Sequence, residues 1–168
     1  SGQIDVPWPN TGFVAVAAGY NKSLGLKSDG SIVDWGSFTG APGYPPEPNT
    51  GFVGIAAGGM NGLGLRADGS VVAWGRLRSL PTPNTGFVAV AVGWAHGLGL
   101  RGDDGSIVGW GSGPTSVPEP NSGFVAVATS EGGGNPAVGS GSHSLGLRGD
   151  GSIVTWGGNV TGLDSIPA

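Results

Sequence analysis

The sequence contains no cysteine, and only 11% of its 168 residues are charged. Without cysteine there are neither disulfide bonds nor thiolate metal ligands, which fits a reducing cytosol and also many bacterial secreted proteins. Of the seven basic residues, four occupy one repeated position, so too few remain for the cationic surface that nucleic acid requires. No apolar run approaches the roughly 20 residues of a membrane-spanning helix. We therefore expect neither nucleic acid nor a membrane as a partner.

Glycine, in contrast, is abundant, with 37 residues, and the apolar residues between the glycines recur with a fixed period. Four asparagines open four copies of one segment at steps of 39, 35 and 37 residues, namely Asn10, Asn49, Asn84 and Asn121. Each copy closes on a tryptophan that we expect to be structural, namely Trp35, Trp74, Trp110 or Trp156. A period near 37 residues is typical of repeat architectures. We expect one domain over 1–168, with repeats at about 6–43, 44–79, 80–116 and 117–168.

Each copy contains the signals of three short strands. In the first copy, a proline-containing lead (6–12) comes before residues 13–19, which are apolar on both alternating faces, as in a strand covered on both sides. Residues 23–36 then give two strands joined by an Asp-Gly turn. The glycine between the two leucines of this hairpin recurs in every copy, and we expect another backbone or sheet to pack tightly against it.

Strands that are apolar on both faces must lie between neighbouring sheets. A radial array of small antiparallel blades provides those neighbours while hiding most sheet edges. We therefore predict an all-β fold, a β-propeller of four short, mainly three-stranded blades. A linear β-solenoid is the alternative, but its repeats are usually shorter and lack a hairpin in each turn.

Across the copies the sequence resembles A-A-G-x-x-(H/N)-(S/G)-L-G-L-(K/R)-x-D-G-S-(I/V)-V-x-W-G, as at 56–75, with Lys22 at the sixth position of the first copy. This pattern resembles the repeats of the regulator of chromosome condensation family, in the short bacterial form seen in β-lactamase inhibitor protein II. The resemblance covers nearly the whole chain. It implies a propeller whose loops on one face bind proteins, and it slightly favours a secreted or cell-envelope bacterial protein. It also implies a ring of typically seven blades, whereas this sequence holds four.

Four blades of this size are not expected to close alone. The two end blades would then expose apolar faces, with residues such as Val14, Val16, Val33 and Trp35. Repeat arrays need a cap or a partner at such ends. We therefore expect self-association, most simply a homodimer in which two halves form an eight-blade ring about a two-fold axis. Trp8, a lead tryptophan that does not recur, is expected at the subunit seam.

The copies differ most in the loop between the first and second strands and in the segment after each Trp-Gly pair. In a three-stranded blade these two regions lie on the same rim, because the first and third strands run in the same direction. The fourth copy has ten extra residues in this loop. The composition of Tyr, Trp, Met and Arg on this rim is that of a recognition surface. The residues that we expect to bind a partner are Tyr20, Asn21, Lys22, Phe38, Met60, Asn61, Arg76, Arg78, Trp94, His96, Glu131 and His143.

An alternative is that Tyr20 and Trp94 pack onto their own blades or cap the central channel. The two histidines, His96 and His143, fall at one repeated position, where a hydrogen-bonding role explains them better than a metal site does. The hairpin aspartates are explained by turn formation rather than by calcium. We expect neither a metal nor a cofactor.

No set of acid, base and nucleophile stands out from the repeat, so an enzyme is not expected. The predicted function is a non-enzymatic protein-interaction module that uses one loop rim. One alternative is a sugar-binding propeller in which Tyr20 and Trp94 stack on saccharide rings, although glycine replaces the aromatic residue in the other two copies. Another is a purely structural, self-assembling half-propeller.

Overall fold

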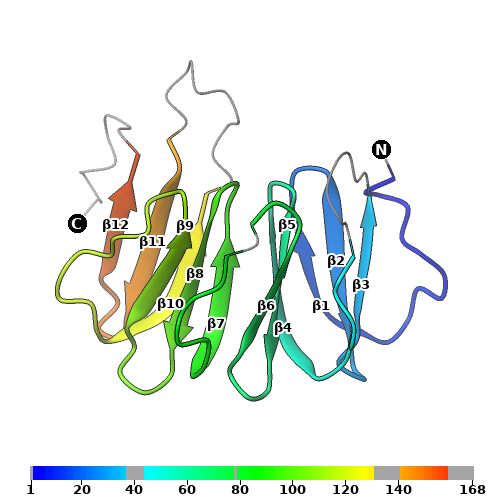
Figure 1. The fold of residues 1–168 in the computed structure, drawn as a ribbon, viewed down its shortest axis with the longest axis horizontal. Coiled ribbons are helices and arrows are strands. Elements are labelled where there is room, and N and C mark those ends of the chain that lie inside the picture. Colours follow the sequence, from blue (N-terminus) through cyan, green and yellow to red (C-terminus); the bar gives the residue numbers. More distant parts are fainter. Residues whose placement is uncertain (1, 37–43, 78, 131–140, 159–168) are drawn as a thin grey trace.

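The computed structural model describes residues 2–36, 44–77, 79–130 and 141–158. These residues form four three-stranded antiparallel sheets, each with its strands in chain order (Figure 1). The strands are β1 (Phe13–Ala18), β2 (Lys22–Lys27), β3 (Ile32–Gly36), β4 (Phe52–Gly58), β5 (Asn61–Arg66), β6 (Val71–Trp74), β7 (Phe87–Val92), β8 (His96–Arg101), β9 (Ile107–Gly111), β10 (Phe124–Thr129), β11 (His143–Arg148) and β12 (Ile153–Gly157). The all-β propeller prediction is confirmed. No helix capable of crossing a membrane occurs in the part of the chain that the structure describes.

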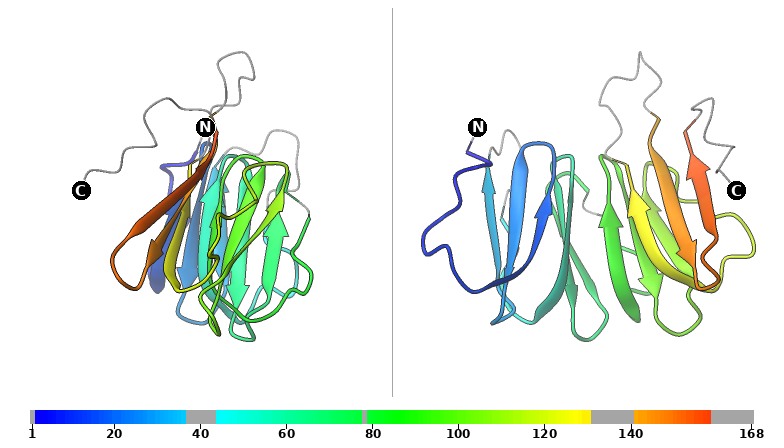
Figure 2. Two further views of the ribbon diagram at one scale, coloured as in Figure 1. Left: turned by 90° about the vertical axis from the view of Figure 1, so that its left-hand side faces the viewer. Right: turned by 180° about the vertical axis from the view of Figure 1, so that it is seen from behind.

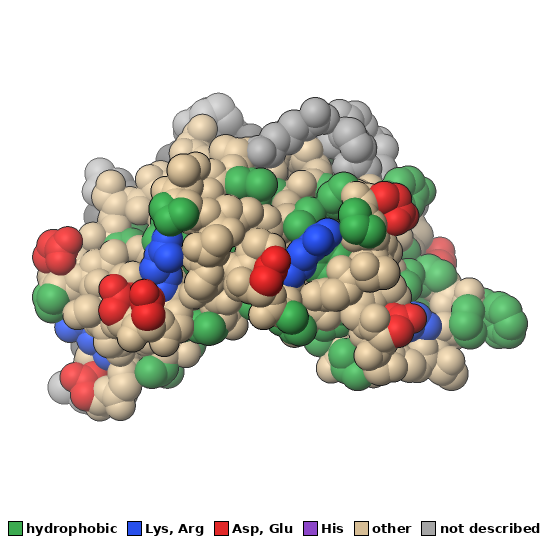
Figure 3. All heavy atoms as spheres, turned by 60° about the horizontal axis from the view of Figure 1, so that its bottom comes forward, with side chains coloured by type: hydrophobic (Ala, Val, Ile, Leu, Met, Phe, Trp, Pro, Cys, Tyr) green, Lys and Arg blue, Asp and Glu red, His purple; other side chains and the backbone are tan. Residues whose placement is uncertain are grey.

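The four sheets follow one another as the blades of an open arc. We number them blade 1 (β1–β3) to blade 4 (β10–β12). The first strand of each blade packs against the blade before it, so that β4 contacts β1 and β2, and β7 contacts β4 and β5. Blades 1 and 4 lie at opposite ends of the molecule in both views of its long axis (Figures 1 and 2). The space-filling view shows the same arched outline (Figure 3).

The recurrent glycine in each middle strand makes room for a phenylalanine ring of its own blade. A methyl group at Gly64 would lie 2.5 Å from Cε1 of Phe52, which begins the paired strand β4. It would also lie 3.1 Å from Cδ1 of Ile32 in the preceding blade. The close approach expected from the sequence is therefore present, but side chains make it and a neighbouring backbone does not.

The apolar core lies in the seams between blades. In the first seam, Leu24, Leu26 and Ile32 of blade 1 form one buried cluster with Phe52 and Trp74 of blade 2. Equivalent clusters fill the second and third seams. Of the four closing tryptophans, Trp74 and Trp110 belong to these clusters and Trp156 packs against the third, whereas the clusters do not include Trp35. Trp74 and Trp110 are buried in internal seams, whereas those of the two end blades are half-buried.

The residues that the sequence placed on the exposed end face of blade 1 differ in how exposed they are. Val16 of blade 1 is 76% exposed, whereas its counterparts in the other blades are half-buried. Val14 is 64% exposed, but Val53 and Val88 in internal blades are each 58% exposed at the same repeated position. The assignment of Val14 to an end face is therefore wrong, because this position faces solvent in every blade. Trp35 is half-buried, and its Nε1 donates a hydrogen bond to the carbonyl of Gln3 (3.0 Å).

The hairpin turns and the leads lie at one rim. At the first turn, Asp29 Oδ1 accepts hydrogen bonds from the amide and the hydroxyl of Ser31, at 2.9 and 2.7 Å. These bonds lower the pKa of the Asp29 carboxyl. The basic residue of each hairpin lies over the phenylalanine ring of its own blade, as Arg66 does over Phe52 at 5.2 Å. The hairpin aspartates thus serve the turns, and no group of metal-ligating side chains forms among the described residues.

Candidate functional site

The opposite rim, which we call the loop rim, carries the residues that the sequence analysis selected. It consists of the connections between the first and second strands of each blade and the segments that follow the third strands (top of Figure 1). Backbone bonds join the two kinds of segment: the Ser112 amide, after β9, donates to the carbonyl of Ala95 in the β7–β8 connection (2.8 Å). The expectation that these regions share a rim is confirmed by this geometry.

Asn61 lies beneath the loop rim, with no exposed surface. Its Nδ2 donates to the carbonyls of Gly93 and Trp94 in blade 3, at 2.9 and 2.8 Å. Its Oδ1 accepts from the amides of Arg76 and Leu77, at 3.0 and 2.8 Å. Asn61 therefore holds two rim segments together from below, and it has no surface to offer a partner directly.

Lys22 occupies the same repeated position in blade 1 and is also buried. Its Nζ forms an ion pair with Asp34 Oδ2 at 2.8 Å, and Trp74 Nε1 of blade 2 donates to the same oxygen at 2.7 Å. Burial lowers the pKa of Lys22 and raises that of Asp34, and the attraction between the two charges opposes both shifts. A buried pair of this kind destabilises the protein if one partner is removed alone. Lys22 thus belongs to the first seam rather than to a binding surface.

His96 occupies this position in blade 3 and forms a seam contact with blade 4. Its Nε2 lies 3.1 Å from Ser144 Oγ, and neither residue has exposed surface. Burial lowers the pKa of His96. A serine and a histidine at this distance could suggest a nucleophile and a base, but substrate has no access to them. His143, one residue before Ser144, is half-buried, and its Nδ1 lies 3.2 Å from the Gly141 carbonyl.

Above these buried residues lies a cluster of three side chains, which we call the rim cluster: Tyr20, Arg76 and Trp94. The Tyr20 and Trp94 rings meet edge to face, with centroids 6.1 Å apart. The Arg76 guanidinium lies over the Trp94 ring at 6.0 Å. Tyr20 is 63% exposed, Arg76 is exposed and Trp94 is half-buried. The three residues come from three different blades, so the fold brings together what the sequence only placed on one rim.

Trp94 is held in place by the blade before it. A methyl group at Gly59 would lie 2.9 Å from Cε3 of Trp94, so only glycine at this position allows the indole to lie so close. The Tyr20 amide donates to the Gly59 carbonyl at 3.2 Å. Gly59 is one of the two glycines that stand where the other copies have Tyr20 and Trp94, and the Trp94 indole packs against its backbone. The Trp94 ring thus contacts Tyr20 of blade 1 and Gly59 and Arg76 of blade 2, in contrast to the alternative that it packs on its own blade.

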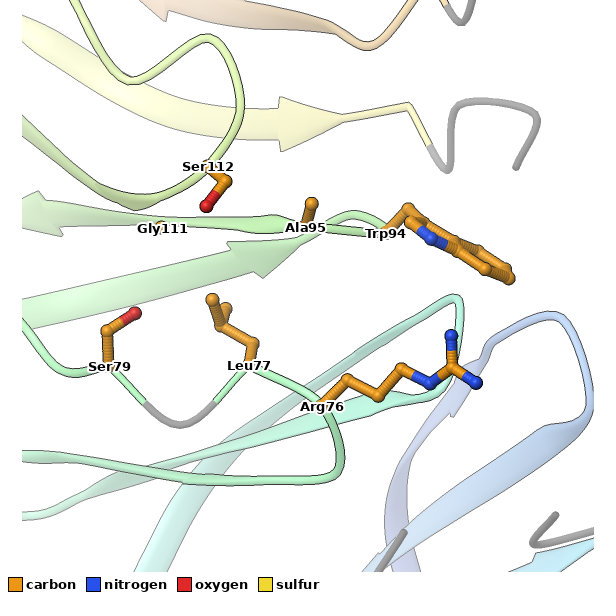
Figure 4. A pocket seen from close by; sticks show the side chains of 7 residues that line it. All are labelled: Arg76, Leu77, Ser79, Trp94, Ala95, Gly111 and Ser112. Carbon is orange, nitrogen blue, oxygen red and sulfur yellow. The ribbon is translucent and has the colours of Figure 1, made fainter. Parts of the chain in front are cut away.

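A pocket of about 400 Å³ opens beside the rim cluster (Figure 4). Arg76, Leu77 and Ser79 line it from blade 2, and Trp94, Ala95, Gly111 and Ser112 line it from blade 3. Arg76 and Trp94 extend together at one end of the lining (Figure 4). The pocket thus combines a guanidinium, an indole and small polar groups, which suits one inserted side chain of a partner better than a catalytic reaction.

The remaining selected residues separate into two groups. Asn21 and Met60 are half-buried in the same loops. Phe38, Arg78 and Glu131 lie outside the described residues. Of the seven pocket residues, the sequence analysis selected Arg76 and Trp94. It did not select Leu77, Ser79, Ala95, Gly111 and Ser112, and four of these are small residues that carry no signal of their own. It also missed Asp34, although one signal was present. The first copy has a charged residue at both of these repeated positions, Lys22 and Asp34, whereas the other copies have Asn or His at the first and Ala, Gly or Thr at the second.

Comparisons with known proteins give the fold and no more. No family model and no curated protein sequence matches the chain. Among solved structures, it is similar to the CRINKLY WD40 ectodomain of the Arabidopsis thaliana receptor kinase ACR4, with a TM-score of 0.66 and 26% identity. That match covers 88% of this chain and 51% of the other. The ectodomain of the Physcomitrella patens receptor kinase CR4 matches with a TM-score of 0.67 and 25% identity, over 88% of this chain and 39% of that one.

Two further proteins of known structure have a lower sequence identity to this chain. Prp20p from Saccharomyces cerevisiae, the yeast RCC1, matches with a TM-score of 0.64 and 19% identity, over 90% of this chain and 45% of that one. Human WBSCR16 matches with a TM-score of 0.63 and 18% identity, over 90% of this chain and 49% of that one. The chain thus spans about half, or less, of these propellers. The fold is that of the RCC1-like propellers, which confirms the resemblance at the level of architecture.

Proposed function

We propose that the chain is a non-enzymatic protein-interaction module that binds its partner through the rim cluster and the adjacent pocket. The observation that carries this proposal is the convergence of Tyr20, Arg76 and Trp94 from three blades next to a pocket. Tyr, Trp and Arg are the residue types that dominate binding energy in protein interfaces. Their rigid support also limits the entropy lost on binding.

The charge of the site indicates the chemistry of the partner. Arg76 is the one exposed charge among the described pocket residues, and it is cationic. An acidic side chain of the partner would pair with it, while an apolar neighbour would contact the exposed ring of Tyr20. The solved structures support a protein partner in general terms, because the similar propeller Prp20p binds Gsp1p and histones. A bacterial origin and the short inhibitor-like form remain predictions from the sequence.

Sugar binding is less favoured by the geometry. A saccharide stacks on an open aromatic face, whereas Tyr20, Arg76 and the backbone at Gly59 already contact the Trp94 ring. Catalysis is also less favoured, because the Ser144 and His96 pair is sealed inside the third seam.

The test is affinity capture with the immobilised chain from extracts of the source organism, quantified by mass spectrometry. Trp94→Ala should lose the proteins that the wild type retains. The matched control is Val88→Ala in the same blade, which removes an apolar side chain that is 58% exposed and lies on β7, away from the loop rim. If retention falls equally for both variants, or for neither, the rim cluster is not the binding site.

We also propose that the chain associates with itself. The support is the exposure of apolar residues at the end of blade 4, where Leu147 is 38% and Ile153 43% exposed. Light scattering that gives a persistent monomer near the chain mass of 16.4 kDa would refute self-association.

A further inference from the structure

The three internal seams use one set of polar contacts. In the first seam, Asn49 Oδ1 accepts a hydrogen bond from the Ile32 amide, and Asn49 Nδ2 donates to the Ile32 carbonyl, both at 2.9 Å. Beside it, the Phe52 amide donates to the carbonyl of Gly30 at 3.0 Å. The same asparagine bonds join Asn84 to Val71 and Asn121 to Ile107, and the same amide bonds join Phe87 to Gly69 and Phe124 to Gly105.

Blade 4 presents one half of a further seam, which we call the back face: Leu145, Leu147, Gly151 and Ile153. Ile153 is 43% exposed, whereas its counterpart Ile32 is 3% exposed. Leu147 is 38% exposed, while Leu26, Leu65 and Leu100 at the same repeated position are 3 to 4% exposed. An apolar pocket of about 220 Å³ lies between Leu145, Leu147 and Ile153.

The turn of blade 4 is equally open. A methyl group at Gly30 would meet the Gly51 amide of the next blade at 3.0 Å. At Gly151, the equivalent turn residue, no described atom lies within 4 Å of that position. The back face therefore has the side chains and the carbonyl of a seam, and no described residue of this chain covers them.

Blade 1 presents the other half, which we call the front face: Asn10, Phe13 and Val16. Asn10 is exposed, although Asn49 at the same repeated position is hydrogen-bonded in its seam. Phe13 is half-buried, whereas Phe52 is 3% exposed. Val16 is 76% exposed, whereas its counterpart Ile55 packs against the cluster of the first seam.

We propose that the front face of one copy docks on the back face of a second copy and forms a fourth kind of seam, identical in chemistry to the three within the chain. The Asn10 amide would pair with the backbone of Ile153, the Phe13 amide would donate to the Gly151 carbonyl, and Val16 would fill the apolar pocket. This inference rests on the proposed self-association and names its surfaces. The proposed occupant is a second copy, because among the described residues the front face carries the asparagine, the phenylalanine and the aliphatic residue that fill the internal seams, and the back face carries the residues that they contact there.

A two-fold axis forms two such seams at once and closes a ring of eight blades. Propellers are built with four to eight blades, so a ring of eight blades lies within the known range.

The test uses opposite charges on the two faces. Val16→Lys places a cation on the front face, and Ile153→Asp places an anion on the back face. Each variant alone should be monomeric by light scattering, because both of its seams would bury an unpaired charge. Mixed in equal amounts, the two variants should form a heterodimer with one wild-type seam and one seam with a Lys-Asp pair. The matched control, Val14→Lys, changes a valine two residues away that faces solvent and should remain a dimer.

The outcomes separate the inference from the proposed self-association. A monomeric wild type refutes both. If the wild type is a dimer and both face variants remain dimers, self-association stands and the front-to-back seam is wrong. If Ile153→Asp is monomeric while Val16→Lys is a dimer, and mixing restores nothing, two back faces pair with each other and the proposed seam is also wrong. Thermal unfolding of each variant checks that its blades are folded.

A finer measurement tests the polar part of the seam. Asn10→Ala removes two hydrogen bonds from each seam but no apolar surface, and it should raise the dimer dissociation constant by about tenfold or more. An unchanged dissociation constant would show that Asn10 does not pair with Ile153.

Discussion

Replacing Asn61 by alanine should strongly destabilise the protein, because Asn61 holds two segments of the loop rim together. Asn61 has no exposed surface and makes four hydrogen bonds to backbone groups, with lengths of 2.8 to 3.0 Å. Each such bond contributes about 1 kcal/mol net, and buried backbone groups left unpaired cost more. We expect the free energy of unfolding to fall by about 3 to 4 kcal/mol, a large part of the 5 to 15 kcal/mol of a typical domain.

The matched control is Asn84→Ala, at the opposite rim of the same seam. Asn84 makes two backbone hydrogen bonds, both at 2.8 Å, in a partly buried position, so we expect a loss of about 1 to 2 kcal/mol. Urea unfolding followed by circular dichroism measures both values. A loss for Asn61→Ala that equals or falls below that for Asn84→Ala would refute the idea that Asn61 holds the rim together.

Two other predictions concern the third seam and the strand packing. His96→Asn should make the free energy of unfolding less dependent on pH in acid. Burial lowers the pKa of His96, so the contribution of the neutral imidazole to the free energy of unfolding is complete above about pH 6.5 and is lost as the pH falls through the lower folded-state pKa. Urea unfolding between about pH 7 and pH 5 should therefore show a steeper loss of stability for the wild type than for the variant, and parallel curves would contradict this. Gly64→Ala should lower the free energy of unfolding by about 2 to 3 kcal/mol, because the added methyl would lie 2.5 Å from the buried Phe52 ring. The control Gly54→Ala, whose methyl would lie 3.5 Å from Leu65, should change thermal stability little. Similar melting temperatures for the two variants would show that the Phe52 ring moves freely.

Most of the fold could be read from the sequence because it repeats. The period located each blade, and alternation and the Asp-Gly turns located the strands, so that the strands begin and end close to the expected residues. The sequence could not reveal how the recurrent glycine is used. A glycine signals close approach, but the Phe52 ring that approaches Gly64 comes from a residue 12 positions earlier, and only the register of β4 against β5 brings the two together.

The candidate site was predicted only in part, for a physical reason. Loop residues that differ between copies are usually exposed and functional, and this rule selected Tyr20 and Trp94, whose rings lie in one cluster. The same rule selected Lys22, Asn61 and His96, which are buried. In a propeller, the residue that ends a loop and begins the middle strand points into the seam with the next blade, so exposure cannot be inferred from the loop alone.

Variation between repeats therefore has two sources in this protein. At the position shared by Lys22, Asn61 and His96, each residue has a different partner: the Asp34 carboxylate of its own blade, a set of backbone groups, and the Ser144 hydroxyl of the next blade. Such a position varies because its partner varies, without any external ligand. A functional position differs because its partner lies outside the chain, and its side chain must then be exposed while its backbone is fixed. Tyr20 has an exposed side chain and Trp94 a half-buried one, and Asn61 fixes the backbone of Trp94 by bonding to its carbonyl. The seam residues thus determine the shape of the rim on which the proposed partner binds.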